Sequence, residues 1–278
     1  MLTETIIFYI LVFIFGTIVG SFLNVLVLRY NTGVSVVKGR SFCFSCGKKL
    51  GTLELIPVFS FIFQGGKCKG CDSKISWQYP IVESLTGILF VGVFMKYFGL
   101  SGLFFDTYYV LISLIIIAVL VSITVYDFKH KIIPDGLVIT FGILALLKIL
   151  ADFFLMPGTP HEIKTHIIWY LVAGPVLALP LFCIWLFSKG RFMGLGDPKL
   201  VLGIGWSLGP IYGLSAIILA FWTGAVYGLV LMVLSKFSWH GLKIDGKTEV
   251  PFAPFLVLGF LLVYFFNIDI LNLGFLIP

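Results

Sequence analysis

The sequence predicts an all-α polytopic membrane protein with about eight transmembrane helices and a small polar head between the first and second helices. Hydrophobic residues make up 59% of the 278 residues and charged residues 12%; soluble domains carry about 25% charged residues. The mean hydropathy is +1.09. The apolar runs are continuous and roughly 20 residues long, unlike the short alternating strands of a membrane β-barrel.

This composition excludes several classes of protein. A chain with so few polar residues cannot coat a water-soluble particle of its size, and disordered, collagen-like and disulfide-scaffold chains have other compositions. The net charge of +6 does not indicate nucleic-acid binding, because the basic residues lie between apolar runs.

Eight apolar stretches follow one another along the chain. The first has Glu4 before it and Arg29 after it, the reverse of a signal peptide, so we expect a retained helix. The sixth is too short to cross about 30 Å of hydrocarbon. We expect it to be a half-helix or to continue into the seventh through Gly209-Pro210. The stretches are 6–28, 81–98, 107–126, 133–151, 167–187, 198–208, 210–235 and 252–270.

Lysine and arginine set the expected orientation. Of the 19 basic residues, 16 lie on alternate connecting segments, which we therefore expect to be cytoplasmic. Both termini then lie outside, which requires an even number of spans. The four basic segments are 29–80, 127–132, 188–199 and 236–250.

Two glycine pairs predict close helix packing. They are Gly16 with Gly20, and Gly224 with Gly228. Such pairs are common in membrane helices and carry no chemistry.

Four of the five cysteines form two pairs in the polar head, Cys43 with Cys46 and Cys68 with Cys71. Two CxxC turns at this separation can supply four thiolates to one tetrahedral Zn²⁺. Disulfide or redox use is the alternative, but the dense positive charge favours a cytoplasmic, reducing location. Four thiolates leave no open coordination position, so zinc would be structural. We expect Gly47 and Gly70 to be turn residues, and Cys183 to be a small apolar side chain.

Two aspartates stand out at the ends of apolar stretches, where charged groups are expensive and often functional. Asp127 ends a long apolar run, although a solvated charge beside the membrane is an alternative. Asp197 lies in Gly194-Leu195-Gly196-Asp197, where helix capping is the alternative. The two glycines would allow another chain to approach this carboxylate. Asp135, after Pro134, is expected to cap a helix.

If the two carboxylates are close, they form an acid/base pair. Like charges a few ångströms apart cannot easily both ionise, so the pair shares a proton. One carboxylate then activates water while the other protonates a peptide carbonyl. This is aspartic proteolysis, which needs no metal and no covalent intermediate.

Together these residues resemble the type IV prepilin leader peptidases, which are bifunctional prepilin peptidase/N-methyltransferases. The resemblance covers nearly the whole chain, and its most specific elements are the paired cysteines and the GxGD-x-K motif. The matching stretches are Gly20 to Val25 with Arg29, the two CxxC pairs, Ile56-Pro57 with Ser60, Gly66 to Lys69, Ile75-Ser76, Tyr79 to Glu83, Asp127, Ile133 to Asp135, Gly194 to Leu200 and Pro251 to Pro254.

The resemblance implies that Asp127 and Asp197 are the catalytic aspartates. It implies a prepilin or pseudopilin substrate in a prokaryotic inner membrane, cut at the cytoplasmic face. It also implies that the head belongs to the part associated with methyl transfer from S-adenosylmethionine, for which Lys67 is a candidate residue. Methylation of the new amine needs a nearby proton acceptor, and Glu83 is a candidate for that role by its placement near the start of the second apolar stretch. We accordingly expect a first helix (1–28), a zinc-binding head (29–80) and a peptidase core (81–278).

The sequence departs from the family pattern around the third cysteine. Members often have Arg-Gly-Arg-Cys-Arg there, whereas this chain reads Gln64-Gly65-Gly66-Lys67-Cys68-Lys69. The usual proline soon after the first arginine is also absent. Cleavage is therefore more firmly implied than methyl transfer.

Three other functions are consistent with parts of the pattern. Presenilin-like and signal-peptide-peptidase-like GxGD proteases share the aspartate motifs but lack the cysteine head. A transporter would place acids at mid-membrane and show paired interruptions in two repeated halves, which we do not find. A nonenzymatic zinc-bearing membrane scaffold is a further alternative.

Overall fold

The computed structural model describes residues 2–97, 103–155, 158–236 and 250–273. Their regular structure is helical, and six of the described helices are long and apolar enough to cross a membrane. The chain forms two compact units, Met1–Ser122 and Ile123–Pro278. The predicted class of polytopic helical membrane protein is therefore confirmed.

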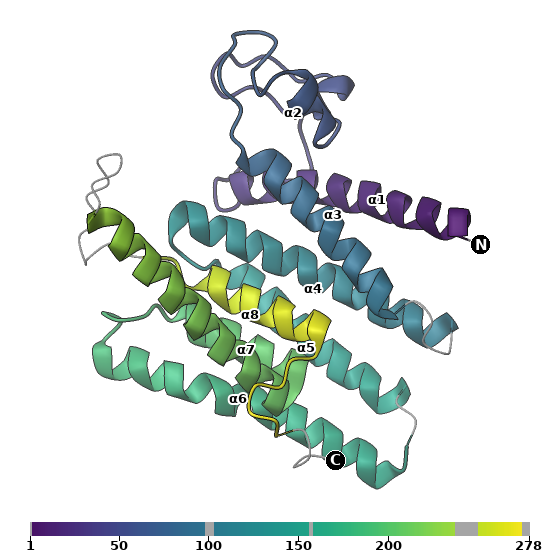
Figure 1. Ribbon diagram of the computed structural model, residues 1–278, viewed down its shortest axis with the longest axis vertical. Coiled ribbons are helices and arrows are strands. Elements are labelled where there is room, and N and C mark those ends of the chain that lie inside the picture. Colours follow the sequence, from purple (N-terminus) through teal and green to yellow (C-terminus); the bar gives the residue numbers. More distant parts are fainter. Residues whose placement is uncertain (1, 98–102, 156–157, 237–249, 274–278) are drawn as a thin grey trace. The chain divides into compact units, whose positions relative to one another are not determined.

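The first unit is built on two long helices, α1 (Leu2–Arg29) and α3 (Gln78–Tyr97), which cross and pack against each other (Figure 1). A Cβ atom on Gly16 would lie 2.7 Å from the Gly87 Cα atom, and one on Gly20 would lie 2.8 Å from the Glu83 Cα atom. Only glycine permits this spacing, so the predicted close approach at the first glycine pair is confirmed.

The head joins these two helices and contains little regular structure. It holds a single 3₁₀ turn, η1 (Thr52–Leu55), the short helix α2 (Phe59–Phe63) and two isolated β-bridges. Across residues 30–77, all of which the structure describes, Cys68 alone is buried. Apolar burial therefore contributes little to holding the head together.

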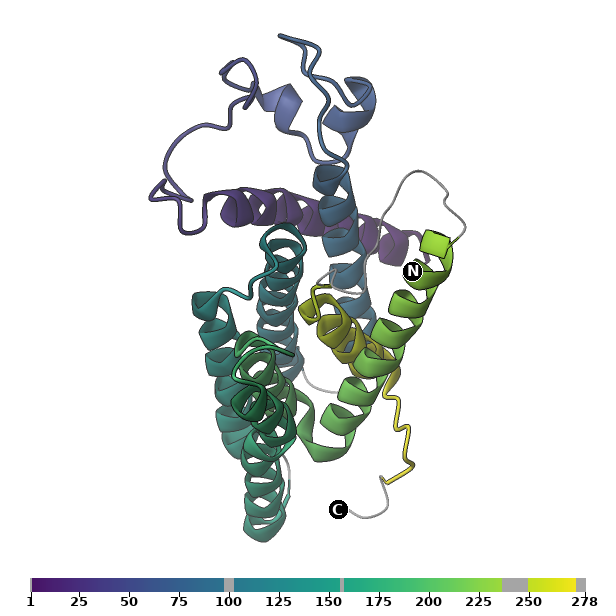
Figure 2. The same cartoon turned by 90° about the vertical axis from the view of Figure 1, so that its left-hand side faces the viewer.

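The second unit contains the end of α4 (Leu103–His130), with α5 (Asp135–Leu155), α6 (Pro160–Ser188), α7 (Gly196–Lys236) and α8 (Ala253–Phe266). Helix α7 packs against α5, α6 and α8 (Figure 2). A Cβ atom on Gly205 would lie 2.7 Å from the Gly174 Cα atom of α6. Small residues thus let α7 approach its neighbours closely.

Helix α7 joins the predicted sixth and seventh stretches and is interrupted at Gly209. The backbone there has φ 78° and ψ −176°, which is not helical. The next residue, Pro210, has no N–H group to continue the helical pattern. The sixth stretch therefore forms a short helix of its own that ends at this break, which is the half-helix of the two alternatives stated for it.

Two sequence expectations were wrong in detail. Helix α6 begins at Pro160 rather than near 167, because Thr159 and Glu162 form a capping box. The second glycine pair makes no close approach: the nearest atom to a Cβ on Gly224 would be 3.5 Å away, and none lies within 4 Å of one on Gly228. Most of the predicted basic segment 236–250 lies outside the described residues.

Candidate functional site

Asp127 and Asp197 come from two helix ends within the second unit. Asp127 lies in the last turn of α4 and is 3% exposed, whereas Asp197 lies in the first turn of α7 and is 7% exposed. The two carboxylates are near enough to interact electrostatically. In the described part of the chain, Oδ2 of Asp127 and Oδ1 of Asp197 are buried without a hydrogen-bond partner. Such oxygens are costly to bury unless a ligand or water satisfies them.

The start of α8 supports the first of these aspartates. The backbone N–H group of Ala253 donates a hydrogen bond to the Asp127 carboxylate. Ala253 is fully buried at the helix N-terminus, where free N–H groups and the helix dipole favour a negative charge. The Pro251-Phe252-Ala253-Pro254 motif, whose structural role the sequence reading left open, therefore positions Asp127.

The Gly194–Lys199 motif has two structural roles. A Cβ atom on Gly196 would lie 2.7 Å from the Ile133 Cβ atom, so this glycine is needed for close packing within the chain itself. Lys199 Nζ donates to Asp135 Oδ1 at 2.7 Å, joining the start of α5 to the start of α7. Asp135 is thus the partner of an ion pair and not the predicted helix cap.

The four head cysteines converge as predicted. Their Sγ atoms all lie within 4.8 Å of one another, and those of Cys43 and Cys71 are 3.9 Å apart. A tetrahedral site with Zn–S bonds of about 2.3 Å requires thiolates roughly 3.8 Å apart. The residues therefore fit a four-thiolate metal centre, whereas Cys183 lies apart on α6.

Both cysteine turns use the same backbone pattern. The Cys43 N–H donates to the Lys48 carbonyl at 2.9 Å, and the Cys68 N–H donates to the Ser73 carbonyl at 3.0 Å. The left-handed residues are Gly47 in the first turn and Asp72 in the second. Gly47 is a turn residue as predicted. Gly70 also lies in its turn, as predicted, and its N–H donates to the Cys68 Sγ atom at 3.4 Å.

Hydrogen bonds prepare two of these thiols for metal binding. The backbone N–H groups of Cys46 and Ser45, followed by the Ser73 hydroxyl, lower the pKa of the Cys43 thiol to about 6. The Ser73 side chain and backbone likewise lower the pKa of Cys71. These donors stabilise the thiolate form, which is the form that binds metal.

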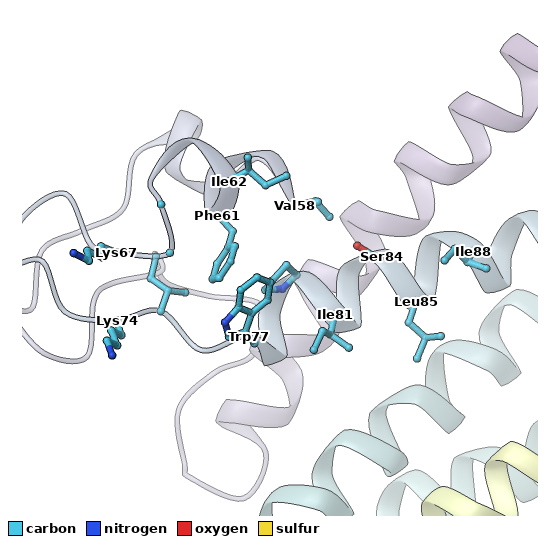
Figure 3. Close-up of a pocket in the computed structure, with 14 residues that line it drawn as sticks. Val58, Phe61, Ile62, Lys67, Lys74, Trp77, Ile81, Ser84, Leu85 and Ile88 are labelled. Atoms are coloured by element: carbon cyan, nitrogen blue, oxygen red, sulfur yellow. The ribbon is translucent and has the colours of Figure 1, made fainter.

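A cleft of about 900 Å³ lies between the head and the first half of α3 (Figure 3). Lys67 and Lys74 lie at one end, on the two strands of a β-bridge. The rings of Phe61 and Trp77 meet in the middle, with centroids 4.7 Å apart. The remaining labelled lining residues are apolar apart from Ser84: Val58, Ile62, Ile81, Leu85 and Ile88. Two lysines facing each other repel, so an anionic group between them would be stabilising.

The structure separates the two predicted methyl-transfer residues. Lys67 lines the cleft, whereas Glu83 does not. The Glu83 side chain is 6% exposed, and its Oε2 atom accepts a 2.7 Å hydrogen bond from the backbone N–H of Val58. Val58 has φ 62° and ψ −53°, a strained conformation for a β-branched residue that costs about 1–3 kcal/mol.

The motif near the end of α1 supports the start of α3. Asn24 is 1% exposed; its side-chain amide donates to the Tyr79 carbonyl at 3.3 Å and its Oδ1 accepts from Gln78 at 3.3 Å. The hydroxyl of Ser21 bonds to Glu83. These polar contacts explain the Gly20–Asn24 motif, and buried polar residues inside an apolar run were the signal that could have revealed them.

Comparison with known proteins places both units in one family. Residues 14–97 match the bacterial peptidase A24 N-terminal domain, and residues 114–229 match the type IV leader peptidase family. No solved structure was found to match the chain.

Curated relatives align over almost the full length. A prepilin leader peptidase/N-methyltransferase of Bacillus subtilis is 31% identical over 264 residues, 94% of this chain and 96% of its own. Proteins of the same description from Legionella pneumophila and Vibrio cholerae are 28% and 27% identical, over 95% and 93% of this chain and 93% and 97% of theirs. Two matching domains and a full-length relative above 30% identity lead to one conclusion: the chain belongs to the type IV leader peptidase family.

Proposed function

We propose that this protein removes the leader peptide of type IV prepilins or pseudopilins with Asp127 and Asp197 as the catalytic pair, and then methylates the new N-terminus. The observation that supports cleavage most directly is the pair of buried carboxylates, each with an oxygen that has no partner in the described part of the chain. The family relatives carry both activities in their description.

The proposed cleavage uses one shared proton. The ionised carboxylate of the pair takes a proton from water, and the resulting oxygen attacks the scissile carbonyl carbon. The protonated carboxylate gives its proton to the carbonyl oxygen. The carbon–nitrogen bond then breaks: the amine leaves with the proton removed from water, and the proton on the former carbonyl oxygen returns to the carboxylate that supplied it. The Ala253 N–H holds Asp127 in place during these steps.

We place methyl transfer in the cleft beside the head. S-adenosylmethionine would supply an activated methyl group, and two of its parts match the lining: Lys67 and Lys74 suit its carboxylate, and the aromatic surface of Phe61 and Trp77 suits its adenine ring. The substrate amine must lose a proton as its new N–C bond forms. Glu83 was expected to accept this proton, yet it does not line the cleft, and its Oε2 atom accepts the backbone N–H of Val58 instead.

The proposed metal is one structural Zn²⁺ held by Cys43, Cys46, Cys68 and Cys71. The four thiolates would fill a tetrahedral shell, so the ion would hold the head together without reacting. The head (29–80) would then be the methyl-transfer part and residues 81–278 the peptidase core.

We further propose eight membrane segments, with both termini outside. Helix α7 would count as two segments because it is broken at Gly209, and the 14-residue α8 as one. The basic loops would place both aspartates and the head on the cytoplasmic side of a prokaryotic inner membrane. The family membership and the head disfavour a presenilin-like protease or a transporter.

Cleavage and methylation can be tested together by co-expression with a prepilin. Asp127→Asn and Asp197→Asn should each lower cleavage roughly 10³-fold or more, and the double variant should be scarcely worse, because the residues act as one unit. Mass spectrometry of the pilin N-terminus reports both reactions. Asp197→Asn should still methylate a pilin supplied already cleaved. Substantial cleavage by Asp127→Asn would contradict the proposed pair, and loss of both reactions in Asp197→Asn would contradict separate sites.

A further inference from the structure

The segment that leads into α2 contains a strained turn. The N–H of Phe59 donates to the Pro57 carbonyl at 2.6 Å, which closes a three-residue γ-turn around Val58. With φ 62° and ψ −53°, Val58 adopts the rare positive-φ form of this turn. A β-branched side chain makes that form particularly unfavourable, so neighbouring contacts must hold it.

Glu83 supplies such a contact from α3. Its carboxylate accepts the Val58 N–H at 2.7 Å, and the Ser21 hydroxyl of α1 bonds to the same carboxylate. The close packing of Gly20 against the Glu83 backbone leaves little room for the side chain to move away. All of these residues belong to the first unit.

The turn sets the direction of α2 and with it one wall of the cleft. The Val58 carbonyl accepts the first hydrogen bond of α2, from the Ile62 N–H at 3.2 Å. Val58 and Phe61 both line the cleft, and the Phe61 ring meets Trp77 (Figure 3). A relaxed turn at Val58 would therefore displace Phe61 from its partner.

We propose that Glu83 is a positioning residue: it holds the γ-turn at Val58 and thereby shapes the ligand-binding wall formed by α2. This inference rests on the proposed methyl transfer in the cleft only in so far as methylation kinetics are used to test it. It differs from the expectation that Glu83 accepts the substrate proton, because it requires an acceptor oxygen at this position but not a negative charge.

Glu83→Gln and Glu83→Ala separate these roles. Glutamine keeps an oxygen for the Val58 N–H, and its amide can donate to the Ser21 hydroxyl; alanine offers neither. We expect Glu83→Gln to keep kcat and KM for methylation within about threefold of the wild-type values, because a substitution without structural effect usually changes them no more than that. Glu83→Ala should raise KM for S-adenosylmethionine by about tenfold or more. Cleavage should be unchanged in both. A roughly 100-fold fall in kcat for Glu83→Gln at constant KM would overturn the proposal in favour of general-base catalysis.

A second substitution tests the strain itself. Glycine adopts positive φ at no steric cost, so Val58→Gly should restore a low KM in the Glu83→Ala protein, whereas Val58→Ala should not. Failure of Val58→Gly to restore it would contradict the proposal.

Amide hydrogen exchange provides a readout that needs no methyl transfer. The amides of Val58 and Phe59 should exchange slowly in wild type and Glu83→Gln and fast in Glu83→Ala. Equal exchange in all three would overturn the positioning role. A wild-type protein that never methylates but shows the expected exchange pattern would instead contradict the proposed methyl transfer alone.

Discussion

In this protein, two residues of the same type can have different roles because their surroundings differ. Asp127 and Asp135 lie eight positions apart on either side of a short connection, yet Asp127 is buried and Asp135 is 66% exposed in its ion pair with Lys199. A buried carboxylate with an unpartnered oxygen is suited to chemistry, whereas an exposed ion pair is worth about 0–1 kcal/mol.

The residue-scale prediction compares these two aspartates. Asp135→Asn should keep cleavage within about tenfold of wild type, because it removes only a solvent-screened ion pair. Asp127→Asn, the matched change, should be far more damaging. The co-expression assay measures both. If Asp135→Asn proves as damaging as Asp127→Asn, the acid/base role belongs to the start of α5.

At the scale of helices, glycine determines which pairs can approach. The two predicted glycine pairs have the same spacing, but only the first faces a neighbouring backbone. Spacing reports that two glycines share a helix face; it cannot report what lies opposite that face. Likewise, hydropathy located every long helix but not the start of α6, which polar capping residues set.

This difference predicts that a Gly→Ala substitution lowers the stability of the protein in the first glycine pair but not in the second. Gly16→Ala should destabilise the protein by about 1–3 kcal/mol, since the new Cβ atom would lie 2.7 Å from the Gly87 Cα atom. Gly228→Ala meets nothing within 4 Å and should be neutral or stabilising. Thermal unfolding in detergent measures both. Equal effects of the two variants would show that α1 and α3 are not packed as described.

For the molecule as a whole, sequence reasoning located chemistry that depends on local spacing and missed contacts that depend on folding. The CxxC spacing was enough to predict a cysteine cluster. The Ala253 amide beside Asp127 was not predictable, because about 125 residues of chain separate the two and backbone donors leave no trace in residue type. The Glu83–Val58 contact was missed for the same reason.

The prediction for the molecule as a whole concerns the proposed metal. Purified protein should contain about one zinc per chain, and a chelator should speed amide exchange across residues 30–77 without exposing the helices of the second unit. Apolar burial cannot replace the metal, since Cys68 alone is buried among those head residues. Cys183→Ser is the control and should retain the metal. Metal-free, fully reduced protein with a protected head would refute a structural ion.

The anchored start of α8 has a consequence for backbone solvation. Fourteen residues reach about 21 Å, well short of a bilayer core of about 30 Å. In the proposed arrangement, with Asp127 at the cytoplasmic face and fixing one end of this helix, the chain after Asn267 would leave helical geometry while still at hydrocarbon depth. Peptide groups there have no water to bond with and need protein partners. The buried Ser215 hydroxyl of α7 accepts from the Ile270 N–H at 3.2 Å and meets one such need.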